Sequence, residues 1–164
     1  MNIPKGGAII ASNHLSFLDP PVIAVTFKKE EIHFLARESL FKGFLGYFIS
    51  RLNAHPVKAF NRELFKEAVK ILKLNGKILI FPEGTRSSDG SFGKIKPGVE
   101  LIANLSSSPI LPVYIHGTKE IWGRDRKFPK FSGKIICHIG KPISPHKEIG
   151  LAIEKAWKEL SACS

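Results

Sequence analysis

The 164-residue sequence contains few cysteines, few acidic residues and no long hydrophobic run. The two cysteines, Cys137 and Cys163, do not make a disulfide framework. No stretch approaches the ~18 consecutive apolar residues of a membrane-spanning helix, and the N-terminus does not have the layout of a signal peptide. We therefore expect a protein of a reducing compartment rather than a disulfide-stabilised secreted domain.

Acidic residues are scarce relative to basic ones, with 14 Asp and Glu against 25 Lys and Arg, for a formal net charge of +11. Such a surface attracts nucleic acid, anionic lipid headgroups or phosphorylated small molecules, and charge alone does not choose among them. The basic residues are spread along the chain and no RNA- or DNA-binding motif is present, which argues against nucleic acid. Length and 43% hydrophobic residues predict one globular domain, residues 1–164.

Apolar runs alternate with segments of helical periodicity, which predicts an α/β fold with a mixed, partly parallel sheet flanked by helices. Pro112 indicates an edge or bulged position for its strand. The last helix is expected to open at Ser144-Pro145 and to bury Trp157. Expected strands are 6–12, 32–36, a short one ending at 57, 77–81, 110–115 and 135–139; expected helices are 20–27, 40–52, 61–74 and 97–105.

The segment NHLSFLD, Asn13 to Asp19, follows the first expected strand and places a histidine five residues before an aspartate. Histidine is the usual general base near neutral pH, and a carboxylate can orient its second ring nitrogen. A turn would bring Asp19 back to His14. Alternatively, Asp19 caps the next helix and His14 is an ordinary strand-end histidine. Ser16 is more simply a turn residue, and no G-x-S-x-G nucleophile motif occurs, so the nucleophile would belong to the substrate.

The segment FPEGTRS begins at Phe81, directly after another expected strand, where ligands bind in α/β sheets. Arg86 offers a fork that suits phosphate, and Gly84 lets the backbone approach a ligand. Lys94 and Lys96 precede an expected helix N-terminus, which adds anion-binding amides. A P-loop is excluded because its motif is absent. A phosphate site and a solvated basic turn both remain open.

Together, N-H-x-x-x-x-D and FPEGTRS resemble the signatures of the glycerolipid acyltransferase superfamily, typified by lysophosphatidic acid (1-acylglycerol-3-phosphate) acyltransferases. Ile3 to Gly7, Lys96-Pro97-Gly98 and Leu111 to Thr118 are also similar to that family. The resemblance covers nearly the whole chain and implies a glycerol-3-phosphate acyltransferase-like fold. Family members usually carry further residues ahead of the I-P-x-G-G segment, so we expect a membrane anchor to be missing here or supplied otherwise.

The resemblance also implies a reaction, in which an acyl group moves from acyl-CoA or an acyl carrier protein to the free hydroxyl of a lysophospholipid, giving phosphatidic acid. His14 would be the base and Asp19 its orienter. No metal and no redox cofactor are expected, and the six histidines show no ligand spacing. The residues expected to hold the glycerol phosphate are Glu83, Gly84, Thr85, Arg86 and Lys96. Many members carry P-V-x-R between the signatures, but Ala59 stands at the arginine position, so Lys58 or Arg62 would supply the cation.

A lipid acceptor implies a peripheral position at the cytoplasmic face of a membrane. The segment 39–52 could lie in the interface or line an acyl-chain groove, or it could pack in the core. The basic segment 123–134 could contact CoA phosphates or headgroups, or be a solvated loop.

Three alternatives to phosphatidic acid synthesis are open: glycerol 3-phosphate as the acceptor, another lyso-lipid as the acceptor, or a non-catalytic module that binds anions or membranes.

Overall fold

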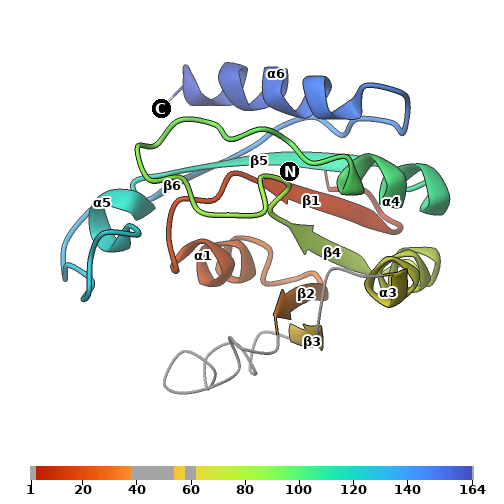
Figure 1. Ribbon diagram of the computed structural model, residues 1–164, viewed down its shortest axis with the longest axis horizontal. Coiled ribbons are helices and arrows are strands. Elements are labelled where there is room, and N and C mark those ends of the chain that lie inside the picture. Colours follow the sequence, from red (N-terminus) through yellow and green to blue (C-terminus); the bar gives the residue numbers. More distant parts are fainter. Residues whose placement is uncertain (1–2, 38–53, 58–61, 164) are drawn as a thin grey trace.

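A six-stranded mixed sheet forms the centre of the computed structural model, which describes residues 3–37, 54–57 and 62–163 (Figure 1). The strand order is β3-β2-β4-β1-β5-β6, and all neighbours are parallel except the antiparallel pair β5 and β6. This confirms the predicted fold class. The elements are β1 (Ala8–Ser12), α1 (Asp19–Thr26), β2 (Ile32–Arg37), β3 (Ala54–Val57), α3 (Arg62–Lys73), β4 (Lys77–Ile80), α4 (Gly98–Ser106), β5 (Ile110–His116), α5 (Thr118–Trp122), β6 (Ile136–Ile139) and α6 (Ile149–Ser161).

Both faces of the central strand β1 are buried, and its alternating side chains enter two separate cores. Ile9 and Ala11 pack with residues of α3, α4 and α6, whereas Ile10 packs with Ile23 of α1 and Phe27. Figure 1 shows α6 along one side of the sheet and α1 on the other. The fully buried Trp157 confirms the predicted core face of the last helix. Helices therefore pack on both faces of the sheet, and they fix the position of the strands whose loops are described below.

The helix expected over 61–74 is confirmed as α3, and Asn75-Gly76 ends it. Asn75 adopts φ 65°, in the left-handed region, and the Gly76 amide donates to the Ile71 carbonyl at 2.9 Å. These are the features of a helix that ends in a left-handed residue, where orphan carbonyls are satisfied by following amides. The chain then turns directly into β4.

Two sequence expectations were wrong. Pro112 lies in an interior strand, because β5 pairs with both β1 and β6. The ladder with β6 spans Val113 to His116, so Pro112 stands just outside it, and its carbonyl accepts from the Gly140 amide. The last helix begins at Ile149 rather than at Ser144-Pro145.

The expected helix 40–52 lies outside the described residues. No helix among the residues that the structure describes is long and apolar enough to cross a bilayer.

Three neighbouring parallel strands, β4, β1 and β5, end at the same edge of the sheet. The loop 81–97 follows β4, the segment 13–18 follows β1, and α5 follows β5. Because carboxyl ends of adjacent parallel strands meet, residues distant in sequence become neighbours there. This edge carries the candidate site.

Candidate active site

His14 and Asp19 form a direct hydrogen bond, with 2.8 Å between His14 Nδ1 and Asp19 Oδ2. The imidazole also stacks on the Phe81 ring at 4.0 Å between centroids. Among the described residues, none contributes a hydrogen bond to the other ring nitrogen, Nε2. The side chain of His14 is 19% exposed, whereas Asp19 is fully buried. The hydrogen bond at Nδ1 and the stacking on Phe81 therefore fix the ring, which leaves Nε2 available for a substrate.

Asp19 is the first residue of α1, and its side chain does not cap that helix. Oδ2 accepts backbone N–H donors from Leu15 and Ser16 at 2.7 and 2.8 Å, in addition to the His14 ring. Oδ1 accepts the Thr118 hydroxyl at 2.7 Å. The capping alternative is thus replaced by a carboxylate that organises the turn preceding its own helix. Its negative charge also suits the positive N-terminal end of α1.

Asn13 fastens this turn to the neighbouring strand. Its amide nitrogen donates to the Ile115 carbonyl at 2.9 Å, and its Oδ1 accepts the Ile115 amide at 2.7 Å. The side chain therefore imitates a sheet partner for β5 just after β1 has ended. Ser16 is a buried turn residue, as predicted, because its hydroxyl donates to the Trp122 carbonyl and accepts the Leu18 amide.

The FPEGTRS loop docks against the NHLSFLD turn through backbone groups. The Ser87 amide donates to the His14 carbonyl at 2.9 Å. Glu83 Oε1 accepts the His14 amide at 3.0 Å, and Oε2 accepts the Gly93 amide at 2.7 Å. The two signatures that stand far apart in sequence thus build one site.

Glu83 occupies a different position from a direct phosphate ligand. It is 5% exposed, and both carboxylate oxygens accept amides of the protein. Burial raises the pKa of the Glu83 carboxyl, and the amide hydrogen bonds from Gly93 and His14 offset part of that rise. A carboxylate would also repel a phosphate. Glu83 therefore joins two loops and holds the His14 backbone in place.

Arg86 has the environment of an anion ligand. Its guanidinium lies 3.6 Å above the centre of the Phe17 ring, and the buried Nη1 has no hydrogen-bond partner among the residues that the structure describes. The Trp122 ring packs against Phe17 at 5.3 Å between centroids, and its buried Nε1 likewise has no partner in the described part of the chain. Burial, followed by the nearby charge of Arg124, lowers the pKa of Arg86, and the negative charge of Asp19 offsets part of that fall. These two buried donors suit the oxygens of an acidic ligand.

Gly84, Thr85 and Lys96 form the more exposed part of the loop. Gly84 has φ 73°, a left-handed conformation that favours glycine, and the end of the Lys96 side chain lies where a Cβ would be, with Cε 2.8 Å from that position. The Lys96 side chain thus crosses the Gly84 backbone and brings a cation to the predicted phosphate cradle. Lys58, Ala59 and Asn61 lie outside the described residues, so the predicted role of Lys58 remains a prediction.

A family model described as Acyltransferase matches residues 1–116. The chain belongs to the acyltransferase family. The chain is similar to the 1-acyl-sn-glycerol-3-phosphate acyltransferase of Bacillus subtilis, with 31% identity over 87% of this chain and 70% of that protein. It is 30% identical to the enzyme of the same name from Pseudomonas aeruginosa, over 98% of this chain and 63% of that one.

A third relative is the chloroplastic LPAT1 of Arabidopsis thaliana, named as a 1-acyl-sn-glycerol-3-phosphate acyltransferase, which is 28% identical over 89% of this chain. The alignments thus span 42–70% of the length of these three relatives. The crystal structure of the 1-acyl-sn-glycerophosphate acyltransferase PlsC from Thermotoga maritima superposes with a TM-score of 0.83 at 31% identity. That superposition covers 99% of this chain and 68% of PlsC, and it extends the likeness beyond the residues that the family model matches.

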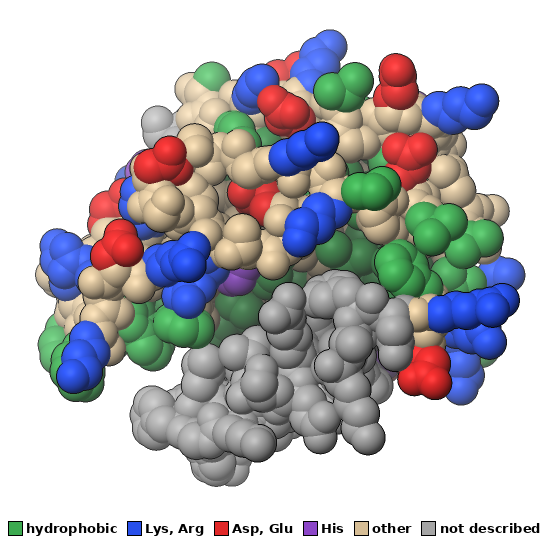
Figure 2. Space-filling view, in the orientation of Figure 1, with side chains coloured by type: hydrophobic (Ala, Val, Ile, Leu, Met, Phe, Trp, Pro, Cys, Tyr) green, Lys and Arg blue, Asp and Glu red, His purple; other side chains and the backbone are tan. Residues whose placement is uncertain are grey.

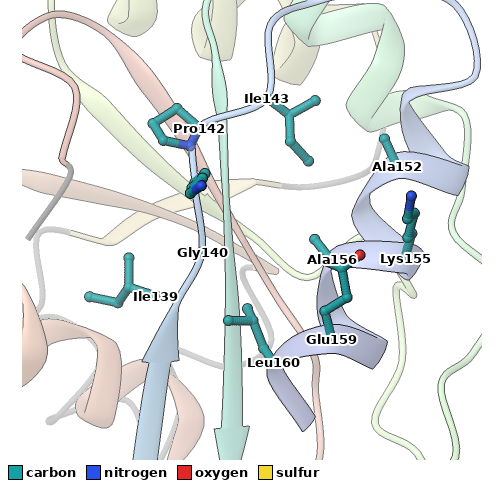
Figure 3. Close-up of a pocket in the computed structure, with 10 residues that line it drawn as sticks. Ile139, Gly140, Pro142, Ile143, Ala152, Lys155, Ala156, Glu159 and Leu160 are labelled. Atoms are coloured by element: carbon teal, nitrogen blue, oxygen red, sulfur yellow. The ribbon is translucent and has the colours of Figure 1, made fainter. Parts of the chain in front are cut away.

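A cavity of about 750 Å³ in this acyltransferase chain lies away from the His14 edge. Figure 3 shows Pro142 and Ile143, from the segment after β6, facing Ala152, Ala156 and other residues of α6 across it. The loops after β1 and β4 do not line this cavity. Its size therefore does not make it the reaction site, because the fixed imidazole and the unpartnered guanidinium lie elsewhere.

Thr118, Phe17 and Trp122 are site residues that sequence reasoning did not assign. Thr118 entered the sequence analysis only as the last residue of a segment similar to the family. In the described part of the structure, its hydroxyl is the hydrogen-bond donor to Asp19 Oδ1. Trp122 directly precedes the basic segment 123–134, and the sequence alone assigned it no site role. Their roles depend on which strand ends lie together, and no local spacing in the sequence reports that arrangement.

Proposed function

We propose that this acyltransferase moves a fatty acyl group from a thioester donor to the free hydroxyl of 1-acylglycerol 3-phosphate, giving phosphatidic acid. The observation that carries the proposal is the His14 ring, which buried Asp19 holds at Nδ1, beside a loop in which the buried Nη1 of Arg86 has no hydrogen-bond partner among the described residues. The names of the similar proteins support the choice of acceptor.

The proposed chemistry uses His14 as a general base. Nε2 takes the proton of the acceptor hydroxyl while its oxygen attacks the thioester carbonyl carbon, forming a tetrahedral intermediate. The carbon–sulfur bond then breaks, and the imidazolium returns the proton to the departing thiolate. The products are an ester and a free thiol. Asp19 keeps the ring in the required tautomer and stabilises the imidazolium, and Thr118 supports Asp19.

In this proposal Arg86 binds the acceptor phosphate, because a guanidinium fork matches phosphate oxygens in pairs. Gly84 and Thr85 contribute close backbone and hydroxyl contacts, and Lys96 contributes a second positive charge. Lys58 is retained as a proposed ligand from sequence alone. Glu83 acts indirectly, by holding the His14 amide and the Gly93 amide.

The proposal places the protein peripherally at the cytoplasmic face of a membrane, with acyl-CoA or an acyl carrier protein as donor. The acceptor and product are lipids, and the net charge of +11 favours an anionic surface. A thioester is already an activated acyl group, so the reaction requires no further cofactor and no metal in this scheme.

The testing experiment measures thiol release from acyl-CoA with and without 1-acylglycerol 3-phosphate, for wild type, His14→Ala and His146→Ala. His146 is an exposed histidine whose ring forms a hydrogen bond with the nearby Ser144 carbonyl, away from the site, so it serves as the matched control. We expect acceptor-dependent release that falls about a thousandfold in His14→Ala and is unchanged in His146→Ala.

The same assay with an acyl carrier protein donor, glycerol 3-phosphate and other lyso-lipids identifies the substrates. Wild type that transfers to none of these acceptors from either donor would refute the proposed activity. Full activity of His14→Ala would refute the mechanism.

A further inference from the structure

The segment between α5 and β6, residues 123–134, combines exposed cations with exposed aromatic rings, and we call it the basic loop. Its only acidic residue is Asp125. Among the residues that the structure describes, its cations form no ion pair. The exposed cations are Arg124, Arg126, Lys127, Lys130 and Lys134.

Two phenylalanines of the basic loop face solvent. Phe128 is 75% exposed and Phe131 is fully exposed, and they are the aromatic members of the exposed large hydrophobic side chains in the described chain. A phenylalanine side chain is entirely apolar. Exposing two such rings to water three residues apart is therefore unfavourable unless something covers them.

The basic loop is held at both of its ends. The Lys130 amide donates to the Ile121 carbonyl at 2.9 Å, and the Arg126 amide donates to the Gly123 carbonyl at 3.2 Å. At the far end, the Lys134 carbonyl lies so close to Gly117 that no side chain fits there. The loop is therefore a built element of the fold, and its exposed rings do not result from a loose terminus.

The base of the basic loop adjoins the candidate active site. The Trp122 carbonyl accepts the Ser16 hydroxyl at 2.6 Å, and the Trp122 ring packs against Phe17, which in turn lies under Arg86. Figure 1 shows the loop extending beyond α5 at one end of the molecule, and Figure 2 shows hydrophobic and basic side chains gathered at that end. A surface that covers this loop would also lie near the proposed phosphate site.

We propose that the basic loop docks on an anionic lipid bilayer, with Phe128 and Phe131 entering the interface and the surrounding cations contacting headgroups. This inference rests on the proposed function for its choice of a lipid occupant. Aromatic rings flanked by Lys and Arg have the composition that membrane interfaces favour. The 75% exposed ring of Phe128 and the fully exposed ring of Phe131 project from an irregular loop rather than from a helix face or a strand edge, which favours a bilayer over an acidic protein.

The test is sedimentation with phosphatidylcholine vesicles, with and without phosphatidylglycerol, at low and high salt. We expect wild type to bind the anionic vesicles, and Phe128→Ser/Phe131→Ser to bind about tenfold more weakly. The matched control is Leu74→Ser/Leu151→Ser, which removes two similarly exposed apolar side chains elsewhere and should bind like wild type.

Charge is tested with Lys127→Glu/Lys130→Glu against Lys141→Glu/Lys147→Glu, which reverses two exposed lysines outside the loop. Only the first pair should weaken binding by about tenfold or more at low salt, and the difference should shrink at high salt. Equal losses in both pairs would show that net charge alone drives binding and would overturn the proposal.

Activity toward a short-chain, water-soluble acceptor separates this inference from the proposed function. Phe128→Ser/Phe131→Ser should keep wild-type turnover with that acceptor and lose it with vesicle-borne acceptor. Vesicle binding that depends on the loop, without any acyl transfer, would support the docking surface and refute only the activity. Unchanged vesicle binding by the loop variants would overturn the docking surface. This holds even if a loop variant loses activity with an acyl carrier protein donor.

Discussion

Replacing Thr118 with valine isolates one contact of the site. Valine keeps the shape of threonine but removes the hydroxyl that donates to Asp19 Oδ1 at 2.7 Å. Thr118 and Asp19 are both fully buried, so water cannot easily replace the lost donor. Oδ2 retains its bonds to the His14 ring and to the Leu15 and Ser16 amides. The substitution therefore leaves the carboxylate in place with one oxygen unsatisfied.

The expected cost follows from the class of hydrogen bond. Removing a donor to a buried charged group costs about 1.5–3 kcal/mol in the free energy of unfolding. For a chain of this length, a loss of about 2 kcal/mol corresponds to roughly 4–8 °C in Tm. If half-satisfied Asp19 orients the imidazole less well, kcat should fall about tenfold, which is ~1.4 kcal/mol of transition-state stabilisation. KM for the acceptor should not change, because Thr118 is not placed at the phosphate.

Thermal unfolding and steady-state acyl transfer measure these two effects separately. Thr118→Ser keeps the hydroxyl and should restore most of kcat. Thr26→Val removes a partly buried hydrogen bond from the Thr26 hydroxyl to the Val22 carbonyl, away from His14. This variant should lower Tm without lowering kcat. A Thr118→Val protein with reduced Tm but wild-type kcat would refute the positioning role and leave Thr118 purely structural.

Three further predictions concern the loop after β4. Arg86→Lys should raise KM for the acceptor more than it lowers kcat, because lysine loses the paired contacts of the fork. Gly84→Ala should lower the free energy of unfolding in urea by about 1–3 kcal/mol, because its φ of 73° strains a residue that has a Cβ. Glu83 has a pKa raised from 4.5 by burial, so its titration contributes stability that is fully present below pH 4.5 and is lost as pH rises through the folded pKa. The stability difference between wild type and Glu83→Gln should therefore shrink as pH increases, measured by urea unfolding between about pH 4 and pH 8.

Each of these has a result that contradicts it. An unchanged acceptor KM in Arg86→Lys would remove Arg86 from the phosphate site. Gly84→Ala with wild-type stability would mean that the left-handed backbone conformation of residue 84 does not require glycine. A wild-type advantage over Glu83→Gln that grows with pH would show that the two amide hydrogen bonds outweigh burial, reversing the direction of the pKa shift.

Much of the fold could be predicted from local pattern, because helix periodicity and helix-stop residues act over a few neighbours. The buried face of α3 and the Asn75-Gly76 stop are of this kind. The position of Pro112 could not be predicted, because a proline tolerated just outside a ladder looks the same in sequence as one at a sheet edge. The start of α6 was missed because Ser144-Pro145 is a good helix opening, but Ile143 still pairs with Ile110 and keeps the chain extended there.

By itself, the sequence determined the kinds of groups available to the site: an imidazole and a carboxylate one turn apart, and a guanidinium after a second strand. Their local spacing is enough to bring His14 and Asp19 together, because only a short turn separates them. The tertiary structure alone decided that Glu83 faces inward and that Thr118 completes the bonding of Asp19. Both depend on β4, β1 and β5 ending side by side in a parallel sheet, and strand order is set by long-range packing that no single stretch of sequence contains.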